Sequence, residues 1–443
     1  MLQPNNMKIA YQGGLVYFQN KFQENFVIYS DNGIITNIAA PQTLNENQGY
    51  KLIDLSDQVL IPGTVNTHNH SFQSLVRGFS DDQPFEKWRD NGIYKFSKKL
   101  DKNGIYTGAL LAFSEMIKYG VTTICDFFYI NNHGNDNAKA VIAAAQDVGI
   151  RLVLARAMYD WSGAPKAYQE TPQEAQRNCL ELMSEFENNS MVTIYPAPHS
   201  LHAASPEMIL AGLEIAKKKN KFLHMHIAEA QYEVKQVKKK LGKTPIKYLN
   251  SIGVCSSKLV GVHCVWVSDD EIEIMADKKV KVSYNPASNM FLGDGVAPIL
   301  KFLKKGVTVG LGSDGACSNN RTSVFDEMRT TSLLQKVTHL DGSVCPAEES
   351  FKMGTKNGGQ VLGLPIGELK KGFYCDFVGL KMNDISLQPF KKKNLIKNIV
   401  YSMSPSAIES VVIQGKQVKA HGKLTSVSEE EVCKKVAQLT RVW

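Results

Sequence analysis

The sequence lacks the patterns of disulfide-rich, membrane-spanning and secreted proteins. The eight cysteines include no C-x-x-C pair, so their spacing favours reduced, mostly packed thiols. No run approaches the roughly 18 consecutive apolar residues of a membrane-spanning helix. The first residues, MLQPNNMKIAYQGG, lack the charged-then-apolar order of a secretory signal. We therefore expect a cytoplasmic protein with no membrane partner.

Clustered positive charge is scarce as well, although the formal net charge is +8. Apart from three lysine triplets, at 217–219, 238–240 and 391–393, the basic residues are scattered. A nucleic-acid-binding surface would cluster them and interleave aromatic side chains, and this sequence does neither. We expect the triplets to be solvated helix faces or loops, and we expect no nucleic-acid partner.

Alternation between apolar β-type runs and helical stretches dominates the middle of the chain. A length of 443 residues fits one large barrel with a smaller appendage. Eight β-then-α units over about 300 residues is the count of a (β/α)8 barrel, the TIM-type α/β fold. The eight runs are VLIPGTVNTHNH, GVTTICDFFY, IRLVLARAMY, MVTIYPAPH, KFLHMHIAE, KLVGVHCVWV, KVKVSYNPASN and GVTVGLGSDG.

The two ends of the chain have strand-like patterns without the intervening helices. Asp31-Asn32-Gly33 is a strong hairpin signal near the start, and Gly415-Lys416 marks a turn near the end. We expect the β-rich start and the β-rich end to pair into one small β-sandwich. The predicted division is 1–62 for the first part of the sandwich, 63–363 for the barrel, and 364–443 for the second part of the sandwich with a terminal helix.

Only ten histidines occur, yet several stand at the ends of the predicted barrel strands. Catalytic residues of such barrels lie at the C-terminal ends of the strands. His68 and His70 are two residues apart on one run, so their side chains share a face and can enter one site together. The other strand-end candidates are His199 on run four, His226 on run five, His263 near the end of run six and Asp314 on run eight.

This set of side chains has the chemistry of a hydrolytic metal site. Neutral imidazoles suit zinc or iron(II), and a carboxylate can complete the ligands. A bound metal can lower the pKa of water from about 16 to about 7. Glu229, three residues after His226, is placed to move protons, and His263 and Asp314 can hold or deprotonate the water.

Each of these residues also has an ordinary structural explanation. A single histidine at a strand end is more often an ordinary core or surface residue, as we expect for His224, His133 and His339. Asp314 alone could simply cap a helix. The conjunction of His-x-His, His-x-x-Glu, His and Asp at strand ends one, five, six and eight favours the metal site.

The chain resembles the amidohydrolase superfamily, in its cytosine-deaminase-like branch. The resemblance rests on PGTVNTHNH, HIAE, GVHCVWVSDDE, SYNPASNMFLGDG and GLGSDGACSNN, and it covers nearly the whole chain. It implies a hydrolase of non-peptide carbon–nitrogen bonds. The residues that it implies are the metal ligands His68, His70, His226 and Asp314, the proton-shuttling Glu229 and the water-polarising His263, with Asp314 also holding the nucleophile.

The same resemblance bears on the metal and the reaction. Binuclear members of the superfamily carry a carboxylated lysine at strand four, and MVTIYPAPHS contains no lysine. We therefore expect one divalent ion, Zn2+ as is usual in this branch, with Fe2+ as the alternative. The activated water would attack a carbon that carries an amino group, and ammonia would leave.

Two subgroups of this branch share motifs with the chain. PASNMFLGDGVAP, GSDGACSNN and EMRTTSLLQK resemble methylthioadenosine/S-adenosylhomocysteine deaminases, which implies that Arg156, His199 and Trp88 contact the substrate. However, Ser97 stands where that group has a ribose-binding glutamate, and a second arginine has no equivalent. Two charge-assisted hydrogen bonds of about 1.5–3 kcal/mol each would be lost.

Other segments resemble formiminoglutamate deiminases. HSFQ supplies Gln73, KWRDNGIYKF supplies Arg89 and FFYINNH supplies Tyr129, all at positions that contact substrate in that group. His202 stands where those enzymes have a carboxylate-binding arginine. If Arg89 faces the site, its planar fork favours an anionic substrate, such as a carboxylated pterin-type ring.

Four functions therefore stay open at this point. The first is a deaminase of an amino-substituted N-heterocycle of the S-adenosylhomocysteine/methylthioadenosine, guanine or pterin type. The others are a deiminase of an acyclic formimino or guanidino amino acid, a triazine-type chlorohydrolase, and a non-catalytic scaffold. In each catalytic case the partner is a small-molecule substrate. By resemblance, we expect a homo-oligomer, a dimer.

Overall fold

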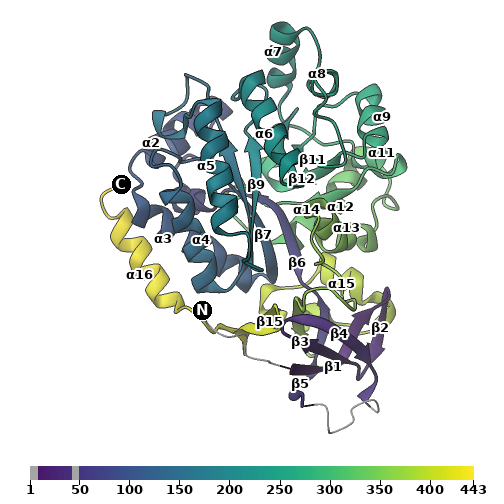
Figure 1. The fold of residues 1–443 in the computed structure, drawn as a ribbon. Coiled ribbons are helices and arrows are strands. Elements are labelled where there is room, and N and C mark those ends of the chain that lie inside the picture. The colour runs from purple at the N-terminus through teal and green to yellow at the C-terminus, as the bar shows by residue number, and fades with distance from the viewer. Residues whose placement is uncertain (1–7, 42–48) are drawn as a thin grey trace.

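The computed structural model describes residues 8–41 and 49–443, and parallel strands form its centre (Figure 1). These strands belong to two four-stranded sheets, with the orders β6-β7-β8-β9 and β10-β11-β12-β13. The strands are β6 Thr64–Asn69, β7 Val121–Phe128, β8 Arg151–Met158, β9 Val192–Pro198, β10 Leu223–Ile227, β11 Leu259–His263, β12 Lys281–Tyr284 and β13 Val309–Leu311.

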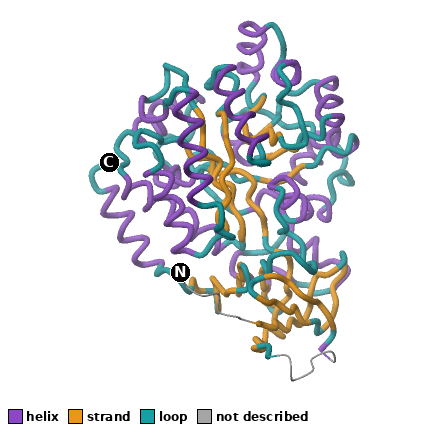
Figure 2. Tube along the Cα trace, in the orientation of Figure 1, coloured by secondary structure: helices purple, strands orange, loops and turns teal. Residues whose placement is uncertain are grey.

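Backbone hydrogen bonds join the two sheets into a closed ring. The amide of His226 on β10 donates to the carbonyl of His199, just after β9, at 2.9 Å. At the other seam, the amide of Asp314 after β13 donates to the carbonyl of His68 on β6 at 3.0 Å. The predicted TIM-type barrel is confirmed, with its helices lying outside the strands (Figure 2).

Burial explains why the barrel strands read as continuous apolar runs. Every residue of β7 and of β8 is buried. A strand in such a barrel turns alternate side chains into the barrel interior and toward the surrounding helices, so neither face meets water. Alternation of polar and apolar residues is therefore absent from both strands.

Capping residues fix where several of the outer helices begin. Thr171 and Ser268 form reciprocal capping boxes at α5 (Pro172–Glu185) and α9 (Asp269–Asp277). Ser205 and Ser323 accept first-turn amides at α6 (Pro206–Lys218) and α12 (Val324–His339). The other outer helices are α3 Lys102–Lys118, α4 Asp136–Val148, α7 Gln231–Leu241, α8 Pro245–Ser251, α10 Pro286–Phe291, α11 Ile299–Lys304, α13 Ala347–Gly354 and α14 Lys356–Leu362.

The connection between β6 and α3 is long and is built from short helical turns. These are the 3-10 helix η2 (Ser71–Val76), α1 (Phe85–Trp88), the π-helix η3 (Arg89–Tyr94) and α2 (Lys95–Ser97). Because this connection follows a barrel strand, it lies at the C-terminal end of the barrel, where barrel enzymes place their sites.

The two ends of the chain meet in one nine-stranded sheet. Its order is β17-β16-β15-β14-β5-β1-β3-β4, with β2 paired to β1. The junction is the antiparallel pair of β5 and β14. The strands are β1 Lys8–Phe18, β2 Lys21–Glu24, β3 Val27–Asp31, β4 Ile34–Ala39, β5 Lys51–Pro62, β14 Phe377–Lys381, β15 Ile408–Ile413, β16 Lys416–Ala420 and β17 Lys423–Leu424.

The predicted turns lie within this sheet. Asn32 and Gly33 join β3 to β4 with φ values of 49° and 79°, as a two-residue type I′ hairpin requires. Gly415, with φ 69°, lies in the turn between β15 and β16. Two helices accompany the C-terminal strands: α15 (Leu395–Tyr401), and α16 (Glu429–Thr440), which packs along α3 (Figure 1).

The predicted division at 62/63 and 363/364 stays a proposal. In its favour, β5 ends at Pro62 and the first barrel strand begins at Thr64. Within residues 8–41 and 49–443, no helix combines the length and apolar character needed to cross a membrane.

Candidate active site

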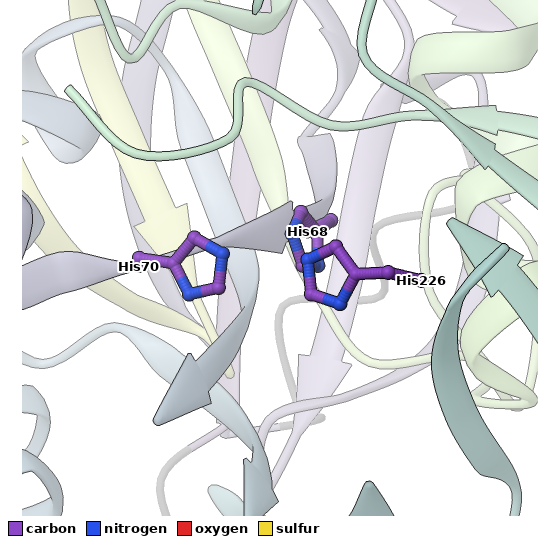
Figure 3. A group of neighbouring side chains, drawn as sticks. All are labelled: His68, His70 and His226. Atoms are coloured by element: carbon purple, nitrogen blue, oxygen red, sulfur yellow. The ribbon is translucent and has the colours of Figure 1, made fainter. Parts of the chain in front are cut away.

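Three imidazoles converge at the C-terminal ends of the barrel strands. His68 lies on β6, His70 follows that strand, and His226 lies on β10. Each offers a ring nitrogen, and these nitrogens all lie within 4.8 Å of one another. Figure 3 shows the three rings turned toward a common region. The shared face expected for His68 and His70 is therefore seen in the structure.

Hydrogen bonds on the outer side orient each ring. Nδ1 of His70 lies 2.6 Å from the carbonyl oxygen of Phe127, and Nδ1 of His226 lies 3.1 Å from that of His199. Nδ1 of His68 lies 3.3 Å from Nε2 of His224. An imidazole held through one nitrogen presents the lone pair of the other, so all three rings offer Nε2 to the common region.

Asp314 supplies a carboxylate to the same place. Its Oδ1 lies 3.6 Å from Nε2 of His68 and 3.4 Å from Nε2 of His70. The Ser288 hydroxyl donates to its Oδ2 at 2.6 Å, and the Gly315 amide donates to its Oδ1 at 2.7 Å. Burial alone would raise the pKa of Asp314, but the neighbouring imidazoles hold it well below the usual range.

The donor set fits a divalent cation. Nε2 of His68 is buried and has no hydrogen-bond partner among the described residues. Burial lowers the pKa of His68 and His226, and it lowers that of His70 to about 3, so the rings stay neutral and keep their lone pairs. Three neutral imidazoles and one carboxylate at this spacing are typical of zinc or iron(II) sites.

Glu229 and His263 border this donor set. Oε1 of Glu229 lies 3.5 Å from Nε2 of His263, which in turn lies 4.0 Å from Oδ2 of Asp314. Burial raises the pKa of Glu229 well above its usual range, and the charges of Asp314 and Glu233 raise it further. The Glu233 carboxylate also accepts the backbone amide of Glu229 at 2.9 Å. A carboxyl group with a raised pKa binds a proton more readily than an exposed one, which suits general acid–base work.

The backbone at His263 is strained. His263 and the next residue, Cys264, have φ values of 68° and 50°, in the left-handed region. For a residue with a β-carbon this conformation costs about 1–2 kcal/mol. The amide of Cys264 donates to the carbonyl of Ile227 at 3.0 Å, which holds the end of β11 in place. Strain of this kind is concentrated at functional sites.

A cavity with aromatic walls leads to the site. It encloses about 660 Å³ of space, open solvent at its mouth included. Among the predicted substrate contacts, its lining includes Gln73, Trp88, Arg89, Tyr129 and His199, beside His70, His226, Glu229 and Asp314. Aromatic walls of this kind favour a flat ring as ligand.

Arg156 lies elsewhere, although the sequence predicted that it faces the substrate. Its guanidinium donates to both carboxylate oxygens of Glu170, at 2.9 and 2.8 Å, and to Asn135 Oδ1 at 2.9 Å. It is fully buried and is not part of the cavity lining. Ser97, at the position of the expected ribose ligand, bonds the Tyr168 hydroxyl and also lies outside the lining.

Sequence reasoning missed much of the cavity wall. The missed aromatic residues are Phe85, Tyr94, Tyr159, Trp161 and Tyr168, all on connections beyond the strand ends. His224 is buried, as expected, and its Nε2 also lies 3.3 Å from Nδ1 of His68. It shares a strand face with His226, two positions later.

A barrel that gathers imidazoles and a carboxylate at its C-terminal end is typical of metal-dependent hydrolases. The chain belongs to the Amidohydrolase family, which it matches over residues 59–418. It is therefore a hydrolase of carbon–nitrogen bonds other than peptide bonds, as its sequence predicted.

Among similar proteins are two deaminases. The 5'-deoxyadenosine deaminase of Methanosphaera stadtmanae is 36% identical over 88% of this chain and 88% of its own length. The 5-methylthioadenosine/S-adenosylhomocysteine deaminase of Thermococcus sibiricus is 37% identical over 88% of this chain and 89% of its own length.

Solved structures with the same fold include an adenosine deaminase from Xanthomonas campestris with bound zinc. It has a TM-score of 0.91 and 22% identity, and the match covers 99% of each chain. A zinc complex of atrazine chlorohydrolase from Arthrobacter aurescens has a TM-score of 0.90 and 22% identity, with 97% of this chain and 99% of that chain covered. At such identities the likeness shows the fold alone.

Proposed function

We propose that the protein is a metal-dependent hydrolytic deaminase that releases ammonia from an amino-substituted N-heterocycle of the adenosine type. The observation that carries this proposal is the convergence of His68, His70, His226 and Asp314 beside Glu229, at the end of a cavity with aromatic walls. The relatives named as 5'-deoxyadenosine and methylthioadenosine/S-adenosylhomocysteine deaminases support the same reaction.

The proposed metal ligands are Nε2 of the three imidazoles and a carboxylate oxygen of Asp314. A divalent cation held there supplies Lewis acidity, which makes hydroxide available near neutral pH. Zinc is the expected ion, because nitrogen-rich sites with one carboxylate suit it and a structural neighbour is a zinc complex. Asp314 and His263 hold the attacking oxygen in line with the substrate carbon.

Proton transfer is the proposed role of Glu229. It takes a proton from the attacking water and delivers it to the ring nitrogen next to the reacting carbon. A carbon–oxygen bond forms, Glu229 then passes the remaining proton of the same water from the new hydroxyl group to the amino group, and the carbon–nitrogen bond breaks as the carbonyl forms and ammonia leaves. The buried position of Glu229 beside His263 suits this role.

Arg89 favours a particular kind of substituent on the ring. It lines the cavity between two aromatic rings, with its guanidinium carbon 5.2 Å from the centroid of Tyr94 and 5.8 Å from that of Trp161. Its Nε donates to Asp90, while neither terminal nitrogen has a hydrogen-bond partner among the described residues. We therefore propose an anionic substituent as a second possibility beside the ribosyl group of the relatives' substrates.

Ammonia release from a panel of amines tests these proposals. The panel contains 5'-deoxyadenosine, methylthioadenosine, S-adenosylhomocysteine, guanine, pterin, pterin-6-carboxylate and formiminoglutamate. We expect turnover of ring substrates, with Arg89→Met raising the KM of anionic ones by about 10-fold or more. Turnover of formiminoglutamate alone would replace the proposal with an acyclic deiminase. Chloride release from a chlorotriazine without ammonia release would indicate a chlorohydrolase.

The cellular location and the oligomeric state of the protein are also proposals. We propose that it acts in the cytoplasm, which agrees with its eight free cysteines, seven of them buried. We propose that it forms a homodimer, which sedimentation equilibrium of the purified protein would test.

A further inference from the structure

Two asparagine side chains cover the far side of the His263 imidazole. Nδ2 of Asn289 lies 3.0 Å from Nδ1 of His263, and Nδ2 of Asn285 lies 3.3 Å from the same nitrogen. All three residues are fully buried. Asn285 directly precedes α10 and Asn289 lies four residues later, a spacing that places both amides on one side of this short helix.

The other ring nitrogen faces carboxylates. Nε2 of His263 lies 3.5 Å from Oε1 of Glu229 and 4.0 Å from Oδ2 of Asp314. It is buried and has no hydrogen-bond partner in the part of the chain that the structure describes. A lone pair on this nitrogen would face two electron-rich oxygens, whereas an N–H group is attracted by them. In a neutral ring the lone pair then belongs to Nδ1, where two amide donors meet it.

The donor end of Asn289 is itself held in this direction. Its Nδ2 lies 3.3 Å from Oδ2 of the buried Asp294, as well as close to His263. Asp294 is fixed in turn, because its backbone amide donates to the carbonyl of Asn289 at 2.8 Å and its backbone carbonyl accepts from the Trp266 indole at 2.6 Å. The amide of Asn289 thus presents Nδ2 to both His263 and Asp294.

We propose that Asn285 and Asn289 are positioning residues that keep the ring hydrogen of His263 on Nε2. His263 then donates a hydrogen bond into the site and retains its hydrogen throughout, so that Glu229 alone carries the proton from water to substrate. The inference rests on the proposed function for this division of roles, but the tautomer itself is a property of the protein without substrate.

The tautomer can be measured directly in the wild-type protein. Nitrogen-15 NMR of zinc-loaded protein with labelled histidine distinguishes a protonated ring nitrogen from an unprotonated one. The His263 signals are assigned by their loss in His263→Gln. We expect Nε2 protonated and Nδ1 unprotonated, and the opposite pattern would overturn the proposal. Because no substrate is added, this result is independent of whether the deaminase assignment holds.

A substitution that introduces a carboxylate then tests the role of the amides. In Asn289→Asp, the new carboxylate accepts a hydrogen from Nδ1 and so draws the ring hydrogen away from Nε2. We expect the NMR pattern of His263 to invert, and kcat on the best substrate of the panel to fall about 100-fold with KM within about threefold. Bound zinc, measured by elemental analysis, should stay at the wild-type level.

Controls separate this role from structural damage. Asn398→Asp changes a partly buried asparagine on α15, whose amide donates to Leu387 and Pro389 carbonyls far from the site, and should leave kcat within about twofold. Asn289→Gln keeps a donor and should recover part of kcat. If Asn289→Asp keeps the wild-type kcat, or loses activity only in proportion to zinc, the positioning role is wrong. If Asn289→Asp does not fold, the wild-type NMR pattern still decides.

Discussion

At the scale of the residue, a substitution at Glu229 tests proton transfer without removing a proposed metal ligand. Its carboxyl group borders His263 and, among the residues that the structure describes, is not part of the groups that could hold an ion. Glu229→Gln keeps the shape of the side chain but cannot carry a proton. We expect kcat to fall by about 10²- to 10⁴-fold with metal content unchanged, as measured by ammonia release and elemental analysis. Near-normal turnover would show that another group moves the proton.

A substitution at His68, in contrast, should reduce metal binding as well as turnover. Its Nε2 is buried without a protein partner, and its Nδ1 is held by His224. His68→Ala removes a proposed ligand, so both bound metal and turnover should fall to a small fraction of the wild-type value. Elemental analysis after gel filtration measures the metal. His339→Ala, an exposed change at the end of α12, is the matched control and should preserve both quantities. Full metal occupancy in His68→Ala would remove this residue from the ligand set.

At the scale of the element, the site residues at the strand ends could be predicted from the sequence, whereas those on the connections could not. A period of two fixes which strand residues share a face, so His68, His70 and His226 could be placed together from the sequence. Tyr159 and Trp161 lie beyond the end of β8, on a connection whose path depends on contacts far along the chain. The ion pair of Arg156 with Glu170 could not be predicted either, because Glu170 lies after a loop whose sequence has no periodic pattern.

The β3–β4 hairpin gives an element-scale prediction. Gly33 has φ 79°, and a β-carbon there would lie 2.6 Å from the carbonyl oxygen of Gln414, at the other end of the chain. Gly33→Ala should lower the free energy of unfolding by about 2 kcal/mol or more, measured by urea denaturation, because backbone strain and a collision add. Gly372→Ala, at φ 85° with no atom within 4 Å, carries the backbone strain alone and should cost about 1 kcal/mol. Equal losses in the two variants would mean that the approach of Gln414 is irrelevant.

At the scale of the whole molecule, the sequence indicated that the chain ends belong together but not how they are fastened to the barrel. Both ends were predicted to be β-rich, and β5 does pair with β14. One attachment is a buried ion pair between Arg151, the first residue of β8, and Asp376, just before β14, two residues separated by 225 positions. A long-range pair of this kind leaves no local pattern, so only the folded chain shows it.

This ion pair carries the last prediction. Nε and Nη2 of Arg151 both donate to the Asp376 carboxylate at 3.2 Å, and the guanidinium lies 3.7 Å from the centroid of the Tyr374 ring. The Asp376 side chain also accepts the amide of Gln414 at 2.7 Å, which ties β15 to the same point. Arg151→Ala leaves a buried carboxylate without its cation, so unfolding free energy should fall by about 3–5 kcal/mol in urea denaturation.

Replacing both partners should cost much less than removing one. In the double variant Arg151→Met, Asp376→Leu no buried charge is left unpaired, and most of the lost stability should return. Turnover should stay near the wild-type value in that variant, because Arg151 lies at the start of β8 while the site lies at the strand ends. A double variant as unstable as Arg151→Ala would mean that the hydrogen bonds to Gln414 and Ser190, rather than the paired charges, fasten the sheet to the barrel.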